Sequence, residues 1–186
     1  MDDDTARSQV LDAADQLFND HGVRAVGMDR IRDASGVSLK RLYRLFPAKE
    51  QLVEAMLRRR DREFQQALTA RIADLPTARE QLLAVFDLLY DWFREPDYRG
   101  CPFINAFAEM SATSRDITTA VEDQKHALKA LLSRLAAAAG GPPALAEQLF
   151  VLANGAMVAA AILHSPEPAR QAKQAAALLL DAETAA

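Results

Sequence analysis

The chain has 186 residues, half of them apolar, and a formal net charge of −4. This length allows one domain or a small domain beside a larger one, and 7 Gly and 8 Pro among abundant Ala and Leu favour an all-α protein. The single Cys101 excludes an internal disulfide framework and a cysteine-based zinc site, and it fits a reducing cytoplasm.

The N-terminal residues Met-Asp-Asp-Asp-Thr lack the basic and apolar regions of a signal peptide. Asp4 or Thr5 is expected to cap a first helix, because apolar residues recur at helical spacing as far as about Asn19. The His21-Gly22 pair ends this helix.

Two short helices are predicted next, over about 28–35 and 39–45, with the turn Ser35-Gly36-Val37 between them. Gly36 is the pivot of this turn, because glycine adopts a positive φ without steric cost. The hydroxyl of Ser38 is placed to cap the second helix, which is rich in Lys and Arg. The pair has the pattern of a helix-turn-helix that reads DNA.

The charge distribution supports a DNA partner although the whole chain is acidic. Residues 21–62 hold 11 Lys and Arg against five Asp and Glu, a net charge of +6 that leaves −10 for the rest. A basic module on an acidic body indicates a regulator with separate DNA and partner regions.

Pro47 closes a small N-terminal unit, so the predicted domains are a helix-turn-helix domain at 1–47 and a larger helical domain at 48–186. Thr77 and Glu80 form a capping-box pattern. No strand is predicted, because the sequence has no alternating run of β-branched residues. The helices expected in the second domain cover about 49–73, 82–94, 103–112, 114–139, 144–164 and 169–182.

The segment 144–164 is apolar around nearly its whole circumference, which predicts burial on all sides. Its apolar run, Leu149 to Leu163, has 15 residues and falls short of the about 20 that a membrane span needs. Burial under a second subunit is favoured over burial inside one chain, because its many alanines let two such helices approach closely. We therefore expect no membrane partner.

Three motifs within residues 10–56 carry a family resemblance: Ala13-Ala14-x-x-Leu17-Phe18-x-x-x-Gly22, Ile31-x-x-x-x-Gly36-Val37-Ser38 and Leu42-Tyr43-x-x-Phe46-Pro47-x-Lys49-Glu50-x-Leu52. Together they resemble the TetR family of transcriptional regulators, and the third motif separates it from other helix-turn-helix proteins. The resemblance implies about nine helices and a homodimer built on the last two, about 144–164 and 169–182. It also implies a palindromic double-stranded DNA operator and a small-molecule effector that releases a repressor from it.

The sequence departs from the common family pattern at the base-reading positions. Many members open the second helix with a Thr pair and the third with Lys-Gly-Thr, where this chain has Val26-Gly27 and Leu39-Lys40-Arg41. Arg32 stands where a small residue is usual. The resemblance therefore indicates DNA binding without indicating which DNA sequence is bound.

Helical spacing selects the side chains that face DNA. Lys40 or Arg44 is suited to guanine in the major groove, and Leu39 to a thymine methyl. Lys49, at the start of the fourth helix, is placed to bind a phosphate. Arg58-Arg59-Arg60 is interpreted as a solvated or intramolecularly paired face. The predicted DNA-binding residues are Arg30, Ser38, Leu39, Lys40, Tyr43, Arg44 and Lys49.

An effector pocket is expected among the larger apolar side chains of the second domain, with a few polar groups that orient a largely apolar ligand. Ordinary core packing is the alternative for each of these residues. A buried structural role is favoured over a redox role for Cys101. The predicted pocket residues are Phe86, Tyr90, Phe93, Phe103, Asn105, Phe107, Met110, His126, Asn154 and Met157.

An enzyme is not expected. The three histidines are far apart in the sequence, and no HExxH, Gly-rich phosphate loop or G-x-S-x-G motif is present. No metal or cofactor is predicted. A purely structural helical adaptor explains the apolar core but leaves the basic turn unexplained.

Overall fold

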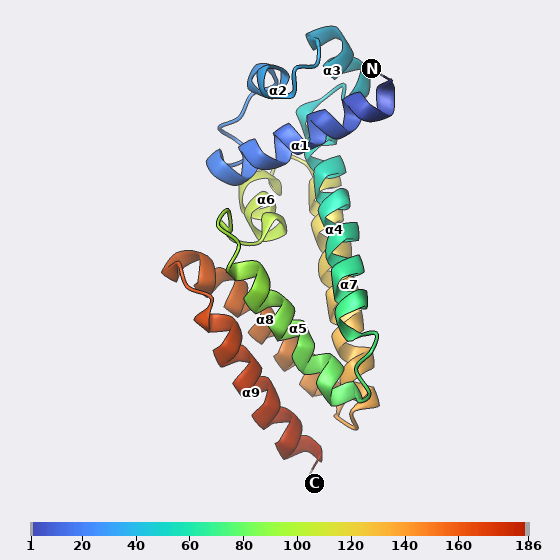
Figure 1. Cartoon of the computed structure of the whole chain (residues 1–186), viewed down its shortest axis with the longest axis vertical. Coiled ribbons are helices and arrows are strands. Elements are labelled where there is room, and N and C mark those ends of the chain that lie inside the picture. The colour runs from blue at the N-terminus through green and yellow to red at the C-terminus, as the bar shows by residue number, and fades with distance from the viewer. Residues whose placement is uncertain (1, 185–186) are drawn as a thin grey trace. The chain divides into compact units, whose positions relative to one another are not determined.

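The computed structural model describes residues 2–184, and within that range it contains nine α-helices and no strand (Figure 1). The all-α prediction is confirmed, and the predicted helix ends lie within a few residues of those observed. The helices are α1 Asp3–His21, α2 Met28–Ser35, α3 Leu39–Leu45, α4 Lys49–Ile72, α5 Ala78–Phe93, α6 Pro102–Met110, α7 Arg115–Ala138, α8 Pro143–Leu163 and α9 Glu167–Thr184.

Local capping residues fix where several helices begin. Ser38 caps α3, since its side chain accepts a hydrogen bond from the backbone N–H of Arg41, and the capping box of Thr77 and Glu80 opens α5. Both caps were predicted from the sequence. The cap of α1 differs from the prediction, because Asp2 accepts the backbone N–H of Thr5 at 2.7 Å and starts the helix two to three residues earlier.

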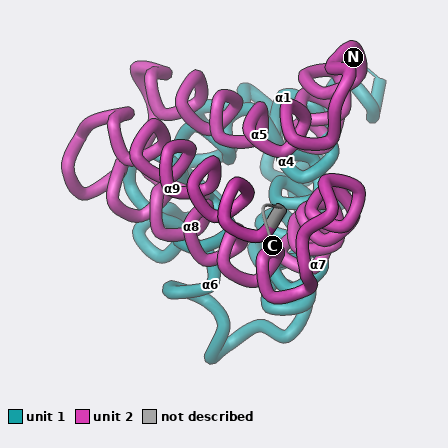
Figure 2. Tube along the Cα trace, turned by 90° about the horizontal axis from the view of Figure 1, so that it is seen from below, with its two compact units in different colours: residues 1–62, 102–123 teal, residues 63–101, 124–186 magenta. Residues whose placement is uncertain are grey.

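The chain divides into two compact units (Figure 2). The first comprises residues 1–62 and 102–123, and the second comprises 63–101 and 124–186. The segment that carries α6 is therefore grouped with α1, α2 and α3, although it follows α5 in the sequence. The predicted division into 1–47 and 48–186 follows the order of the chain and stays a prediction.

The first unit contains the small core expected for crossed helices. Ile31 of α2, Val37 of the turn and Leu42 of α3 are all buried. The N-terminal helix covers this core from one side, where the guanidinium of Arg7 lies 4.5 Å from the centre of the Phe46 ring. A cation over an aromatic face is attracted by the ring quadrupole, so this contact ties α1 to the end of α3.

The second unit is built on α5, α8 and α9, which pack on one another. Phe86 and Leu89 of α5 and Leu149 of α8 lie in its core. Two ion pairs join α5 to α9 at the surface: Lys173 Nζ lies 2.6 Å from a carboxylate oxygen of Asp87, and Arg79 pairs with Asp181 at 2.9 Å.

The apolar helix α8 is buried on only part of its circumference within this chain. Val151 is 67% exposed and Ile162 is 70% exposed, so the alternative of burial inside one chain is wrong, and burial under a second subunit stays a prediction. Within residues 2–184, α8 is the one helix with the length and composition to cross a membrane. Buried core helices share those properties, and Leu145, Leu149 and Ala153 of α8 are buried here.

Candidate nucleic-acid interface

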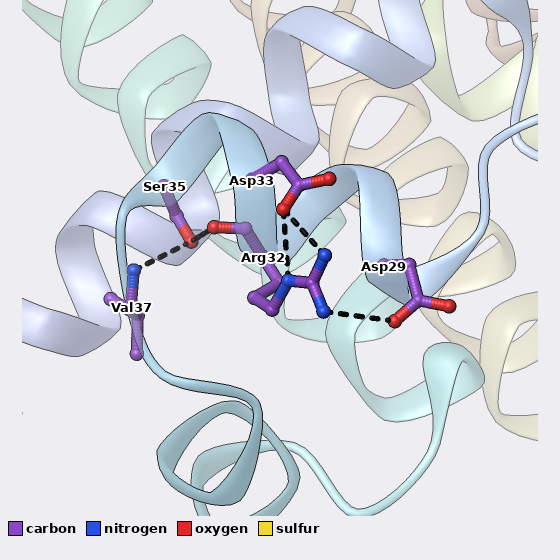
Figure 3. Close-up of polar contacts among 5 residues, drawn as sticks. All are labelled: Asp29, Arg32, Asp33, Ser35 and Val37. Atoms are coloured by element: carbon purple, nitrogen blue, oxygen red, sulfur yellow. Dashed lines mark hydrogen bonds and ion pairs between the residues drawn. The ribbon is translucent and has the colours of Figure 1, made fainter.

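Hydrogen bonds from Ser35 and Gly36 to one carbonyl fix the turn between α2 and α3, and Figure 3 shows the bond from Ser35. The carbonyl of Arg32 accepts the backbone N–H of Gly36 at 3.0 Å and the hydroxyl of Ser35 at 3.2 Å. Gly36 has φ 66° and ψ 8°, the left-handed conformation that the sequence predicts for this position. The turn therefore sets the direction in which α3 leaves α2.

The unusual Arg32 lies along the surface of α2 between two carboxylates (Figure 3). Its Nε and Nη2 donate to one oxygen of Asp33 at 2.9 and 2.6 Å, and Nη1 lies 3.6 Å from Asp29. The hydrogen bond to Asp33 is the main cause that raises the pKa of Arg32. The extra cation of α2 is thus paired within its own helix.

Helix α3 presents a polar and aromatic face to solvent. Leu42 is buried, whereas Leu39, Lys40, Tyr43 and Arg44 are exposed, with Tyr43 at 46%. Positions 39 and 43 lie one turn apart, as do 40 and 44, so an apolar pair and a basic pair run side by side. Ser38 is exposed at the start of the helix. These are the outward positions that helical spacing predicts.

Lys49 begins α4 and lies against the loop between α1 and α2. Its Nζ donates to the carbonyl of Arg24 at 3.5 Å. Burial lowers the pKa of Lys49, while the neighbouring Glu50 and Glu109 act in the opposite direction. Glu109 of α6 also accepts the backbone N–H of Arg24 at 2.7 Å.

Several other cations of this unit make intramolecular contacts. Arg30 Nη2 lies 2.6 Å from Nε2 of His21. Arg59 pairs with Asp12 at 2.5 Å, and Arg60 pairs with Asp15 at 2.8 Å. The interpretation of Arg58-Arg59-Arg60 as a paired face is confirmed, since Arg58 pairs with Glu54 and Asp123.

Asp3 and Glu109 make contacts at this surface that the sequence did not predict. Asp3 lies at the first position of α1 and pairs with Arg41 and Arg44 of α3. No local pattern marks either carboxylate, because Asp3 is 41 residues from Arg44 and Glu109 is 85 residues from Arg24.

The predicted pocket residues fall in different environments. The amide of Asn154 donates to the carbonyl of Phe150 in its own helix at 2.9 Å. Tyr90 is half-buried, with the guanidinium of Arg170 4.3 Å from its ring centre. Whether these side chains line one cavity stays a prediction. Phe86, Phe93, Phe103, Met110 and Met157 are buried, whereas Asn105, Phe107 and His126 are exposed.

Tyr98 brings two of the predicted pocket residues together. Its ring centre lies 4.8 Å from that of Phe93, and its hydroxyl donates to the carbonyl of Met157 at 2.7 Å. Burial raises the pKa of Tyr98, so the hydroxyl remains a donor. Cys101 is buried too, and its Sγ lies 3.7 Å from Nζ of Lys125.

Two family models match the chain. Residues 10–56 match the model described as bacterial regulatory proteins of the tetR family. Residues 78–176 match the model described as the tetracyclin repressor-like C-terminal domain. The first match covers α2, the turn and α3. The second covers α5 to α8 and the first half of α9.

Solved structures and a curated relative agree with these matches. A TetR-family transcriptional regulator from Streptomyces coelicolor superposes with a TM-score of 0.90 at 30% identity, over 97% of this chain and 96% of that one. The reduced form of NemR from E. coli gives 0.83 at 26% identity, over 92% and 94%. The transcriptional activator FasR of Mycolicibacterium smegmatis is 32% identical over 133 residues, which are 70% of this chain and 60% of FasR.

Proposed function

The chain belongs to the TetR family of transcriptional regulators, and we propose that it is a ligand-released repressor that binds a palindromic operator as a homodimer. The exposed face of α3 carries this proposal, because Leu39, Lys40, Tyr43 and Arg44 point to solvent from a helix held by a tight turn. Its place of action is the cytoplasm, where the chromosome is accessible.

In this proposal α3 enters the major groove with its outward face toward the bases. Lys40 and Arg44 donate to guanine O6 and N7, and Leu39 contacts a thymine methyl. The hydroxyl of Tyr43 binds a phosphate while its ring packs on the sugar. Support comes from the matching chemistry of the face, which combines long donors with an apolar pair one helical turn apart.

Lys49 and Arg30 are proposed to bind phosphates at the edges of this face. The free backbone N–H groups at the start of α4 attract an anion together with the charge of Lys49. Contacts of this kind fix the register of a protein on DNA without reading sequence. Ser38 is proposed to contribute its exposed hydroxyl at the start of α3.

The proposed dimer uses the exposed apolar side of α8 and α9. A groove of ≈ 650 Å³ runs between these helices and is lined by Val151, Leu152, Ala175, Leu178 and Leu179, with Glu147 and Gln148 at one end. Leu178 is 71% exposed. Contiguous apolar surface of this kind is unusual on a monomer. A second copy of the same face, related by a two-fold axis, would bury it on both chains.

The proposed release mechanism is a two-state equilibrium of the dimer. A largely apolar effector binds in the helical C-terminal domain and shifts α4, which changes the separation of the two α3 helices. A ligand releases DNA in this way only if it binds the released state more tightly than the DNA-bound state. The effector is a small molecule with a few polar groups.

Transcription in vitro from the promoter next to the chain's own gene tests the direction of regulation. A repressor lowers the transcript level in proportion to occupancy of the operator. Because the relative FasR is a transcriptional activator, activation is the second candidate function. A transcript level that rises with bound protein would replace repression by activation, and an unchanged level at full occupancy would exclude both at that promoter.

A further inference from the structure

The carboxylate of Asp3 holds two arginines of α3 at once. Arg44 Nη2 lies 2.5 Å from Oδ1 of Asp3, and Arg41 donates to the same oxygen from Nε at 3.0 Å and from Nη2 at 2.9 Å. We call these three residues the Asp3 clamp. It joins the first residue of α1 to the helix that is proposed to read DNA. Figure 1 shows the start of α1 next to α3.

Neighbouring residues of α1 fix the position of Asp3 in the clamp. Asp3 and Arg7 lie one helical turn apart and share a face, and Arg7 covers the ring of Phe46 just after α3. Ala6 and Val10 continue this face and are buried. Asp2 caps α1 directly before Asp3. The backbone of Asp3 is therefore held in place on both sides.

The Asp3 carboxylate offers the two guanidinium groups an anionic oxygen acceptor, as a DNA phosphate does. Arginine binds carboxylate and phosphate oxygens with the same N–H donors and the same planar geometry. The side chains of Asp3 and Arg44 are 54% and 61% exposed, so solvent weakens their pairing and DNA is able to displace it. The clamp and a phosphate thus compete for the same two cations.

We propose that Asp3 is a specificity-determining residue that acts as an internal phosphate mimic and withholds Arg41 and Arg44 from DNA of arbitrary sequence. Non-specific binding depends almost wholly on cations that contact phosphates. Its affinity is therefore lowered more than operator affinity when Asp3 occupies two of these cations. The operator complex keeps its base contacts, because Asp3 accepts only from Nη2 of Arg44 and the other N–H groups of this guanidinium are left to donate to guanine. This inference rests on the proposed role of α3 in DNA reading.

Asp3→Asn tests the clamp, because it removes the charge and leaves the side chain the same size. Affinity is measured on a random-sequence duplex and on a selected operator over a series of salt concentrations. We expect Asp3→Asn to bind the random duplex roughly three- to tenfold more tightly, with a steeper salt dependence. Operator affinity changes by less than about twofold, so the specificity ratio falls.

Asp4→Asn is the matched control, since Asp4 is the next residue, is exposed and has a side chain that makes no hydrogen bond or ion pair in the described part of the chain. It changes the net charge by the same amount and is expected to leave both affinities close to wild type. The unfolding temperatures of both variants verify that the fold is unchanged.

A second comparison uses Arg41→Gln/Arg44→Gln as the background. There Asp3→Asn is expected to have no larger effect than Asp4→Asn, because the clamp no longer exists. Equal effects of the two Asn variants in the wild-type background would overturn the proposal, as would an Asp3→Asn effect that persists without the two arginines. Failure of the wild-type protein to bind any DNA would instead contradict the proposed function.

Discussion

Glu109 of α6 accepts a hydrogen bond from the backbone N–H of Arg24 at 2.7 Å, so a helix that follows α5 in the sequence holds the loop between α1 and α2. The same carboxylate lies close to Gly22, where an added Cβ would stand 3.1 Å from one of its oxygens. Lys49 donates to the carbonyl of the same residue, Arg24. The loop beside the proposed DNA-binding face is thus fixed by α4 and α6 together.

Glu109→Ala is expected to lower the free energy of unfolding by about 1 kcal/mol, because the N–H of Arg24 loses its charged acceptor. Chemical denaturation measures this change. Glu122→Ala, an exposed carboxylate of α7 in the same unit, is the control and is expected to have little effect. Equal stabilities of the two variants would show that the Glu109 contact contributes nothing.

Gly36→Ala is expected to destabilise the protein by about 1–2 kcal/mol. The cause is the backbone, since φ is 66° and no heavy atom lies within 4 Å of an added Cβ. Gly27→Ala is the matched comparison, because its φ of −90° suits any residue and its Cβ also meets open space. A smaller loss is expected at Gly27, measured by thermal unfolding, and the reverse order would contradict the strain at the turn.

Lys40→Ala is expected to weaken operator binding by about 1–3 kcal/mol and to relax the preference at a single base pair. Binding to operators substituted one base pair at a time provides the measurement. Arg62→Ala removes the same charge from an exposed position on α4 and serves as the control. If Lys40→Ala weakens binding equally on every sequence, Lys40 binds phosphate and not a base.

Charged substitutions test the proposed dimer face of α8 and α9. Val151→Glu/Leu178→Glu places two carboxylates in the groove of α8 and α9, where burying an unpaired charge is costly. We expect the wild type to sediment as a dimer, and the variant to sediment as a monomer that binds the operator poorly. Ser133→Glu, exposed on α7, controls for added charge. A variant that remains dimeric would place the interface elsewhere.

The N-cap of α1 gives stability a defined pH dependence. Hydrogen bonds from Thr5 lower the pKa of Asp2 below its usual 3.8, so the carboxylate is favoured in the folded state. This contribution is present above pH 3.8 and is lost as the pH falls through the lowered pKa. Asp2→Ala is expected to unfold at lower temperature than wild type near neutral pH and at a similar temperature in strong acid. Asp2→Asn keeps a side-chain oxygen for the cap but carries no charge. The difference between its unfolding temperature and that of Asp2→Ala is therefore expected not to disappear in strong acid.

Local signals explain how much of the fold was predictable. Gly36, Ser38 and the Thr77–Glu80 pair act within a few residues of themselves, and each fixes a turn or helix start where the sequence predicts it. Contacts between distant segments carry no such signal, and the Asp3 clamp and the Glu109 contact were therefore missed. Which side of α8 stays exposed was not predictable either, because an apolar sequence does not reveal which of its faces the same chain covers.

The selection of bound sequences from a random pool of duplex DNA tests whether a homodimer of this chain recognises a palindromic operator. We expect enrichment of a palindrome whose half-sites lie about one helical turn (~34 Å) apart, as two α3 helices of a dimer require. The bound complexes are expected to dissociate steeply with added salt. A pool that shows no enriched sequence, or that yields a single unpaired half-site bound by a monomer, would contradict this proposal.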